Sequence, residues 1–134
     1  NLDRIQIVKG WMDQGEHRER VYDVALSDDR KVRKDGQVLE LVDTVDTKNA
    51  TYANTIGATE LGTLWIDQDF DPEQQAFYYA RVLEIPTPRW TTYDAAAFEI
   101  PPPNNVPTTV QQRVYSSPVW YVPLAAGTDS DCQG

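Results

Sequence analysis

Apolar and polar residues alternate along the first part of the chain in a way that predicts a β-hairpin. In residues 4–11, RIQIVKGW, the apolar side chains at 5, 7 and 11 share one parity, and in residues 20–26, RVYDVAL, those at 22, 24 and 26 do. The stretch DQGE lies between these runs and supplies turn residues. Because a period of two places alternate side chains on one face of a strand, we expect two antiparallel strands joined by a turn.

Short apolar runs continue to the end of the chain. The turn dipeptide Asp35-Gly36 precedes a run at 38–42, and prolines end a longer run at 76–85. Further extended segments are expected at 51–56, 61–66, 109–115 and 118–122, with at most one helical turn near residue 60. Many short strands with abundant turn residues predict an all-β fold: an antiparallel, immunoglobulin-like β-sandwich with long proline-rich loops. A small barrel is the alternative.

The length of 134 residues suits one domain with one core. We assign residues 1–123 to a single β-sandwich-like domain and residues 124–134 to a polar C-terminal tail. The alternation predicts seven contributors to the core, which are Ile5, Ile7, Val24, Leu64, Tyr79, Val82 and Val114.

The charge balance narrows the range of partners. Twelve basic and 21 acidic residues give a net charge of −9, which argues against a nucleic acid or an anionic membrane surface as a partner. No apolar run approaches the roughly 20 residues that span a bilayer, so membrane insertion is not expected. Cys132 is the single cysteine, which excludes a disulfide within the chain. The chain begins at Asn1 and enters a strand pattern at once, which we interpret as a piece of a longer protein.

Candidate catalytic chemistry is sparse. Asp67, Asp69 and Asp71 have the alternate spacing of a calcium loop, but Pro72 and Tyr78 stand where that loop needs a flexible turn and a closing glutamate. A solvated turn is therefore favoured over a weak calcium site. His17 is the only histidine, so a histidine-based metal cluster cannot be built, and no nucleophile motif or phosphate loop is present. We expect no catalytic residue and no cofactor in this chain.

The stretch IPTPRW supplies the candidate binding residues. Pro86 and Pro88 end the strand at 76–85 and should carry Arg89 and Trp90 on a stiff extended segment to the end of the domain. Three alternatives remain open for the nearby set Arg89, Trp90, Tyr93 and Asp94: local packing of Trp90 in a buried corner, which is favoured, contact with another domain, or binding of a saccharide or similar ligand.

Long strings of the chain resemble a known bacterial family. RIQIVKGW, VYDVALS, TYANTIGATELGTLWIDQDFDP, AFYYARVLEIPTPRWTTYDA and RVYSSPVWY are similar, in the same order, to segments in the C-terminal part of domain-of-unknown-function family 3604. The resemblance implies a periplasmic or secreted bacterial protein several times longer than this chain. It also implies an upstream region related to metal-dependent hydrolases, which would be the main partner of this segment. The chain is then expected to be an accessory domain without a catalytic centre of its own.

Overall fold

The structure is a computed structural model and describes residues 1–33 and 37–124. Its main feature is a long hairpin of β1 (Leu2–Asp13) and β2 (Glu16–Leu26), joined at Gln14 and Gly15. Both turn residues have positive φ, 49° and 84°, as the tight hairpin turn requires. The predicted first hairpin is therefore confirmed.

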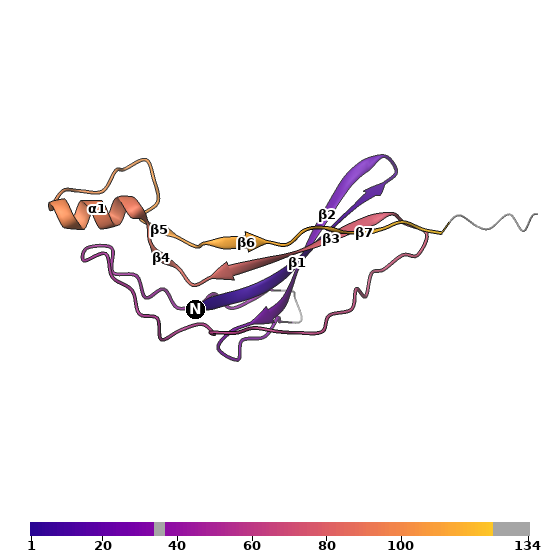
Figure 1. Ribbon diagram of the computed structural model, residues 1–134, viewed down its shortest axis with the longest axis horizontal. Helices are drawn as coiled ribbons and strands as arrows, with labels where there is room; N and C mark the ends of the chain where they lie inside the picture. The colour runs from indigo at the N-terminus through magenta and orange to yellow at the C-terminus, as the bar shows by residue number, and fades with distance from the viewer. Residues whose placement is uncertain (34–36, 125–134) are drawn as a thin grey trace, which may run out of the picture.

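Strand β1 lies in the middle of the main sheet. On its other side it pairs antiparallel with β3 (Ala76–Glu84), which confirms the predicted strand at 76–85. The short strands β6 (Arg113–Tyr115) and β7 (Val119–Tyr121) both pair with the far edge of β3, one near each end. The sheet order is β2-β1-β3-β6, with β7 also on β3, and Figure 1 shows this long twisted ribbon.

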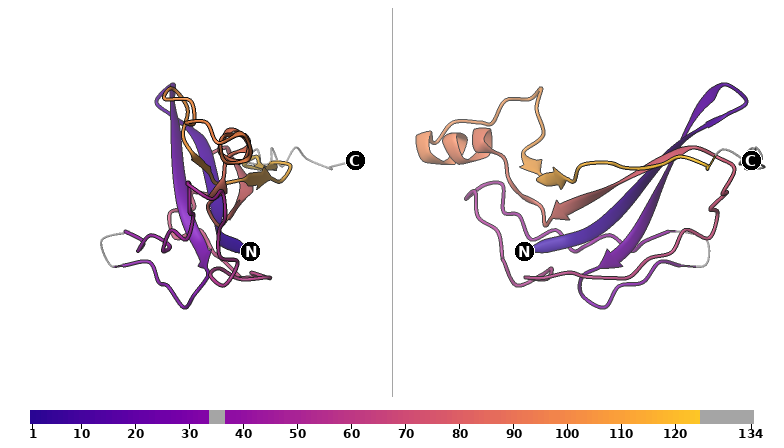
Figure 2. Two further views of the ribbon diagram at one scale, coloured as in Figure 1. Left: turned by 90° about the vertical axis from the view of Figure 1, so that its left-hand side faces the viewer. Right: turned by 45° about the vertical axis from the view of Figure 1, so that its right-hand side comes forward.

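A smaller unit extends beyond one end of the main sheet. It consists of β4 (Thr87–Pro88), α1 (Trp90–Phe98) and β5 (Thr109–Val110), with β4 and β5 paired antiparallel. The helix projects past the sheet in Figure 1 and in the right-hand view of Figure 2. Antiparallel pairing throughout the described residues confirms the all-β class predicted from the sequence and is consistent with a sandwich.

The two faces of the main sheet have different environments. One face carries Ile7, Lys9 and Tyr78, and the long loop between β2 and β3 packs on it, with Trp65 against Tyr22 and Tyr78. Figure 2 shows this loop running beside the hairpin. The opposite face carries Val8 and an aromatic row described below. The loop thus forms a second layer on one side only.

Several predicted strands are absent from the sheets. Among the described residues of the long loop, the runs at 38–42 and 51–56 make only isolated bridges, at Val38 and Thr51, and the run at 61–66 makes none. The helix α1 was not predicted; Thr92 and Tyr93 donate their backbone N–H groups to the Arg89 carbonyl at its start. The alanine run favours the helix, whereas the loop segments lack a neighbouring strand to pair with.

The core differs from the one predicted. Leu64 and Val114 are 91% and 65% exposed, so these two assignments are wrong. The other five predicted residues are partly shielded. The buried apolar residues among those described are Val8, Ala50, Ala76, Ile85 and Ala95. Leu64 is exposed because the segment around it pairs with no strand, and Val114 because it lies on an edge strand.

No helix in residues 1–33 and 37–124 is long and apolar enough to cross a membrane. Asp35-Gly36, Cys132 and all of the predicted tail after Leu124 lie outside the described residues.

Candidate functional site

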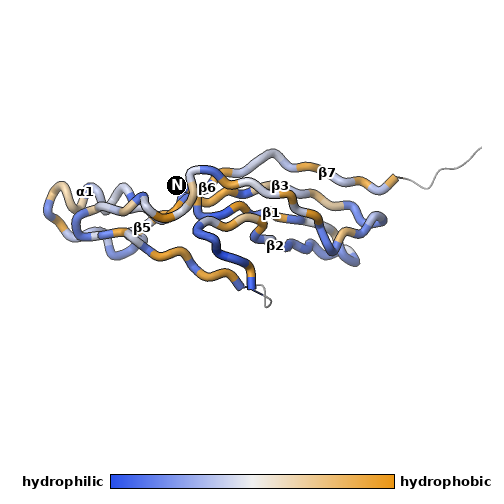
Figure 3. The backbone as a smooth tube through the Cα atoms, turned by 90° about the horizontal axis from the view of Figure 1, so that it is seen from below, coloured by the Kyte–Doolittle hydropathy of each residue, from blue (hydrophilic) through white to orange (hydrophobic). Residues whose placement is uncertain are grey.

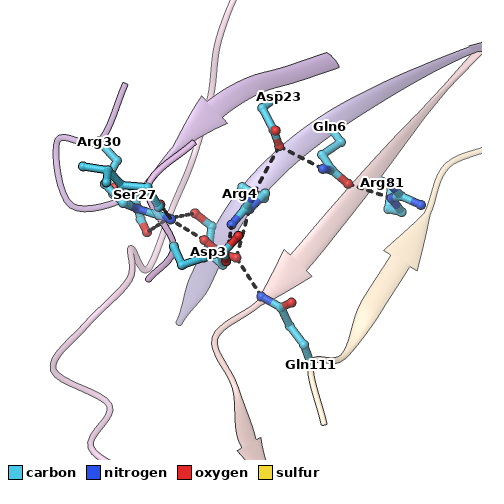
Figure 4. Close-up of polar contacts among 10 residues, drawn as sticks. Asp3, Arg4, Gln6, Asp23, Ser27, Arg30, Arg81 and Gln111 are labelled. Atoms are coloured by element: carbon cyan, nitrogen blue, oxygen red, sulfur yellow. Dashed lines mark hydrogen bonds and ion pairs between the residues drawn. The ribbon is translucent and has the colours of Figure 1, made fainter. Parts of the chain in front are cut away.

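A buried carboxylate fastens two loops to the start of β1. Asp3 is 1% exposed, and its Oδ2 accepts hydrogen bonds from Arg4 Nε at 3.0 Å and Gln111 Nε2 at 2.7 Å. Its Oδ1 accepts a hydrogen bond from Arg30 Nη2, which also donates to the Asp3 carbonyl at 2.8 Å. Figure 4 shows these donors converging from separate segments. Every Asp3 oxygen is thus used internally, so this cluster holds the fold together.

A second polar row crosses three strands of the same sheet. Gln6 on β1 donates from Nε2 to Asp23 on β2 at 2.8 Å and accepts from Arg81 Nε on β3 at 2.8 Å (Figure 4). The amide therefore links an acidic and a basic side chain that lie on either side of it. This row also leaves no shielded charge free for a ligand.

The first aspartate of the weak calcium candidate is part of a buried ion pair. Lys9 Nζ donates to Asp67 Oδ2 at 2.6 Å and to the Asp69 carbonyl at 2.9 Å, and Tyr78 OH donates to the same Asp67 oxygen at 2.8 Å. Burial alone would raise the pKa of Asp67, but the hydrogen bonds from Lys9 and Tyr78 outweigh it and lower that pKa. Burial and the Asp67 carboxylate both raise the pKa of the Tyr78 phenol.

Asp69 and Asp71, the other two aspartates of the calcium candidate, also accept hydrogen bonds from the protein. Asp69 Oδ2 accepts from Arg20 Nη1 at 2.6 Å, and Asp71 Oδ1 accepts from the backbone N–H of Glu73 at 2.9 Å. In residues 1–33 and 37–124 no group of three or more His, Cys, Asp or Glu side chains is arranged to hold a metal ion. The geometry does not support calcium binding, because cationic side chains of the protein already neutralise two of the carboxylates.

Three of the four predicted binding residues meet at one hollow beside α1. Arg89, Trp90 and Tyr93 line it together with Tyr52 from the long loop. The floor comes from the small sheet through Thr87, Pro88 and Val110, with Gln112 at its edge. The cavity volume is about 420 Å³. Pro88 fixes the extended backbone that leads into Arg89, whose φ and ψ are −71° and 155°. The helix α1 then begins at Trp90.

Trp90 is 67% exposed, so the expected packing in a buried corner is wrong. The prolines do carry Arg89 and Trp90 out of the main sheet, but the chain then turns into a helix that directs Trp90 outward. Asp94 is exposed and does not line the hollow, and no hydrogen bond or ion pair joins it to Arg89. The structure therefore brings Arg89 together with the aromatic rings of Trp90 and Tyr93, but it does not bring Asp94 to the hollow.

Sequence reasoning missed Tyr52 and Gln112 as lining residues. Tyr52 stands 37 positions before Arg89 and belongs to a loop without regular pairing, so no periodicity connects it to the hollow. Gln112 lies just after β5, whose pairing with β4 brings it near Arg89. Only that pairing, which is a tertiary feature, could have identified it.

The open face of the main sheet carries a continuous row of aromatic rings, which we call the aromatic face: Tyr115, Tyr79, Phe77 and Trp120. Neighbouring ring centroids are 6.1, 6.4 and 5.2 Å apart in that order. Trp120 is 62% exposed and Tyr115 is also exposed. In Figure 3, hydrophobic segments recur along β3 and β7, whereas the outer part of β2 is hydrophilic.

A groove adjoins the aromatic face at the tip of the hairpin. It has a volume of about 690 Å³, and both Phe77 and Trp120 contribute to its wall. His17 and Glu73 line its polar side. Both of these side chains are exposed, so the groove offers apolar contact area more than a set of converging catalytic groups.

Comparison with known protein families identifies a match. A family model described as "Protein of unknown function (DUF3604)" matches residues 1–123, which confirms the resemblance identified in the sequence. No curated protein and no solved structure matches the chain.

Proposed function

The chain belongs to the DUF3604 family of proteins of unknown function, and we propose that it is an accessory β-domain that packs against an upstream, metal-dependent hydrolase domain of the same polypeptide. In this proposal the protein is bacterial and works in the periplasm or outside the cell, and the chemistry resides in the upstream domain. The observation that carries the proposal is the aromatic face, which leaves large apolar side chains in contact with water.

The small core supports this role. Five buried apolar residues among those described, three of them alanine, are few for a domain of this size. Large side chains of the aromatic face are exposed instead, Trp120 at 62% and Tyr115 at 56%. Monomeric proteins rarely expose contiguous apolar patches of this kind unless another surface covers them. A covering domain would complete the burial that the chain does not achieve alone.

The total accessible surface also indicates that another domain covers part of this chain. It is 10043 Å² for the whole chain, whereas a compact monomer of this mass exposes about 7,100 Å². Residues 34–36 and 125–134, even counted at the fully unfolded value, account for at most roughly 1,700 Å² of the difference. The remaining excess of about 1,200 Å² exceeds the roughly 800 Å² that each partner buries in a standard interface.

Hydroxyl-radical footprinting of this chain and of the longer parent protein tests the docking. We expect oxidation of Trp120 and Tyr115 to fall in the longer protein. Trp90 is the matched control, since it is similarly exposed but begins α1, which lies at the other end of the molecule from β7 (Figure 1), and its oxidation should not change. Equal oxidation of Trp120 in both proteins would contradict docking through the aromatic face.

Hydrolase assays with and without divalent metal ions test the catalytic part. The chain alone should give no metal-dependent turnover, and the longer protein should. Metal-dependent turnover by residues 1–134 alone would rule out a purely accessory role. Absence of turnover by the longer protein on a broad ester and phosphoester panel would count against the hydrolase assignment.

A second candidate function is saccharide binding in the hollow beside α1. The observation that favours it is the meeting of Arg89, Trp90 and Tyr93 at one concave surface, with Trp90 exposed. Exposed aromatic rings beside a polar group suit the flat apolar face and hydroxyl rim of a sugar ring. A glycan array probed with the 134-residue chain tests this function. We expect the chain to bind at least one glycan, and the Trp90→Ala variant to bind none.

A further inference from the structure

Arg89 differs from the other shielded arginines of the described chain. Arg4, Arg30 and Arg81 each donate side-chain hydrogen bonds to protein acceptors. Arg89 forms no ion pair with the residues that the structure describes, and its Nε atom is buried without a hydrogen-bond partner among them. This occurs although the chain carries 21 acidic side chains. Because no protein carboxylate pairs with this guanidinium, its outer N–H groups can form charge-assisted hydrogen bonds with an anionic ligand.

The surroundings of Arg89 are also free of acidic groups. Among the described residues that line the hollow, Arg89 is the only charged one. The first turn of α1 contains no acidic side chain, and Arg89 at the N-cap makes no side-chain capping bond. The positive end of the helix dipole and the guanidinium therefore act at the same place, in a protein whose net charge is −9.

The walls of the hollow suit a ring. Trp90, Tyr93 and Tyr52 present three aromatic side chains, each at least 41% exposed. The volume of about 420 Å³ lies at the lower end of the range for small-ligand sites. One or two sugar rings fit such a space. The guanidinium provides a planar fork that pairs with both oxygens of a carboxylate.

From these observations we infer that the hollow beside α1 binds an acidic saccharide, with a uronic acid ring against Trp90 and Tyr93 and its carboxylate on Arg89. This inference rests on the second candidate function and specifies its ligand class. It is independent of docking through the aromatic face, which lies on the main sheet.

Titration calorimetry of the 134-residue chain tests the inference in 150 mM salt. The probes are tetramers of galacturonic, glucuronic, mannuronic and guluronic acid, each paired with its fully methyl-esterified form. Esterification keeps the rings and removes the charge. We expect at least one acid tetramer to bind roughly ten- to a hundredfold more tightly than its ester, because a charge-assisted hydrogen bond is lost. Amide shifts in nuclear magnetic resonance spectra should map to Tyr52, Trp90 and Tyr93.

Three variants identify the contacts. Arg89→Gln should remove the preference for the acid form and keep weak binding of the rings, whereas Trp90→Ala should weaken both forms. Arg113→Gln is the matched control, since Arg113 is exposed and lies outside the hollow, and it should bind like the original chain.

Equal affinity for acid and ester would overturn the inference and leave neutral saccharide binding intact. No binding of any probe would overturn both. Equal losses in Arg89→Gln and Arg113→Gln would show non-specific charge attraction and would also overturn the inference.

Discussion

Lys9 and Asp67, 58 positions apart in the sequence, form a buried ion pair in which Nζ lies 2.6 Å from Oδ2. Lys9 is in the middle strand of the sheet, and Asp67 is in the long loop that covers it. Tyr78 on the neighbouring strand donates to the same carboxylate oxygen. The pair therefore fixes the loop to the face that it covers, and its loss should release that layer.

Replacing Asp67 by Asn tests this role. The substitution leaves a lysine that is 3% exposed without its counter-charge, and breaking such a pair costs about 3–5 kcal/mol of unfolding free energy. Urea denaturation measures the loss. Asp71→Asn is the control, because Asp71 is exposed and caps only a local turn; its cost should stay near 1 kcal/mol. Similar costs for the two variants would contradict the proposed importance of the pair.

The same carboxylate should make stability depend on acid pH. Its pKa in the folded protein is lowered, so the stability it contributes is present above the unfolded value of about 3.9 and is lost as pH falls through the folded pKa. We expect the melting temperature to fall below about pH 4. Thermal scans between pH 3 and 7 measure this. In Asp67→Asn the fall should be shallower, and an unchanged slope would exclude Asp67 as its source.

Gly10 is required by the ring of Phe77 on the neighbouring strand. A Cβ atom at Gly10 would lie 2.3 Å from the Phe77 ring, far inside contact distance. We expect Gly10→Ala to cost about 1–3 kcal/mol through overpacking. Gly62→Ala is the control, since no described atom lies within 4 Å of a Cβ there. Phe77→Leu in the Gly10→Ala background should restore part of the stability; if it restores none, the clash is not the cause.

Trp90→Ala should leave the stability of the chain nearly unchanged. The side chain is 67% exposed, and surface substitutions of this kind usually alter the unfolding free energy by no more than about 0.5 kcal/mol. Chemical denaturation followed by circular dichroism measures the difference. A loss on the order of 3 kcal/mol, as expected for a core tryptophan, would show that Trp90 is packed after all.

Local patterns predicted those elements whose partners are close in sequence or whose strand signal is strong. The hairpin of β1 and β2 follows from alternation on both sides of a turn, and β3 from a run of aromatic and branched residues. The same signal at 61–66 was misleading because suitable side chains form a strand only where a neighbouring backbone can pair with them. The helix after Arg89 was not predicted because the two prolines before it favour an extended backbone, whereas its alanine run is short.

In the candidate site, too, some features follow from the sequence and others only from the tertiary structure. The sequence by itself determined that Arg89, Trp90 and Tyr93 follow a proline-stiffened exit from the main sheet, because proline fixes φ and withholds its backbone donor. It also determined the family and the all-β class. The tertiary structure decided that Trp90 is exposed, that Tyr52 joins the hollow and that Arg89 has no acidic neighbour there. These properties depend on which distant segments meet, and a one-dimensional pattern does not contain that information.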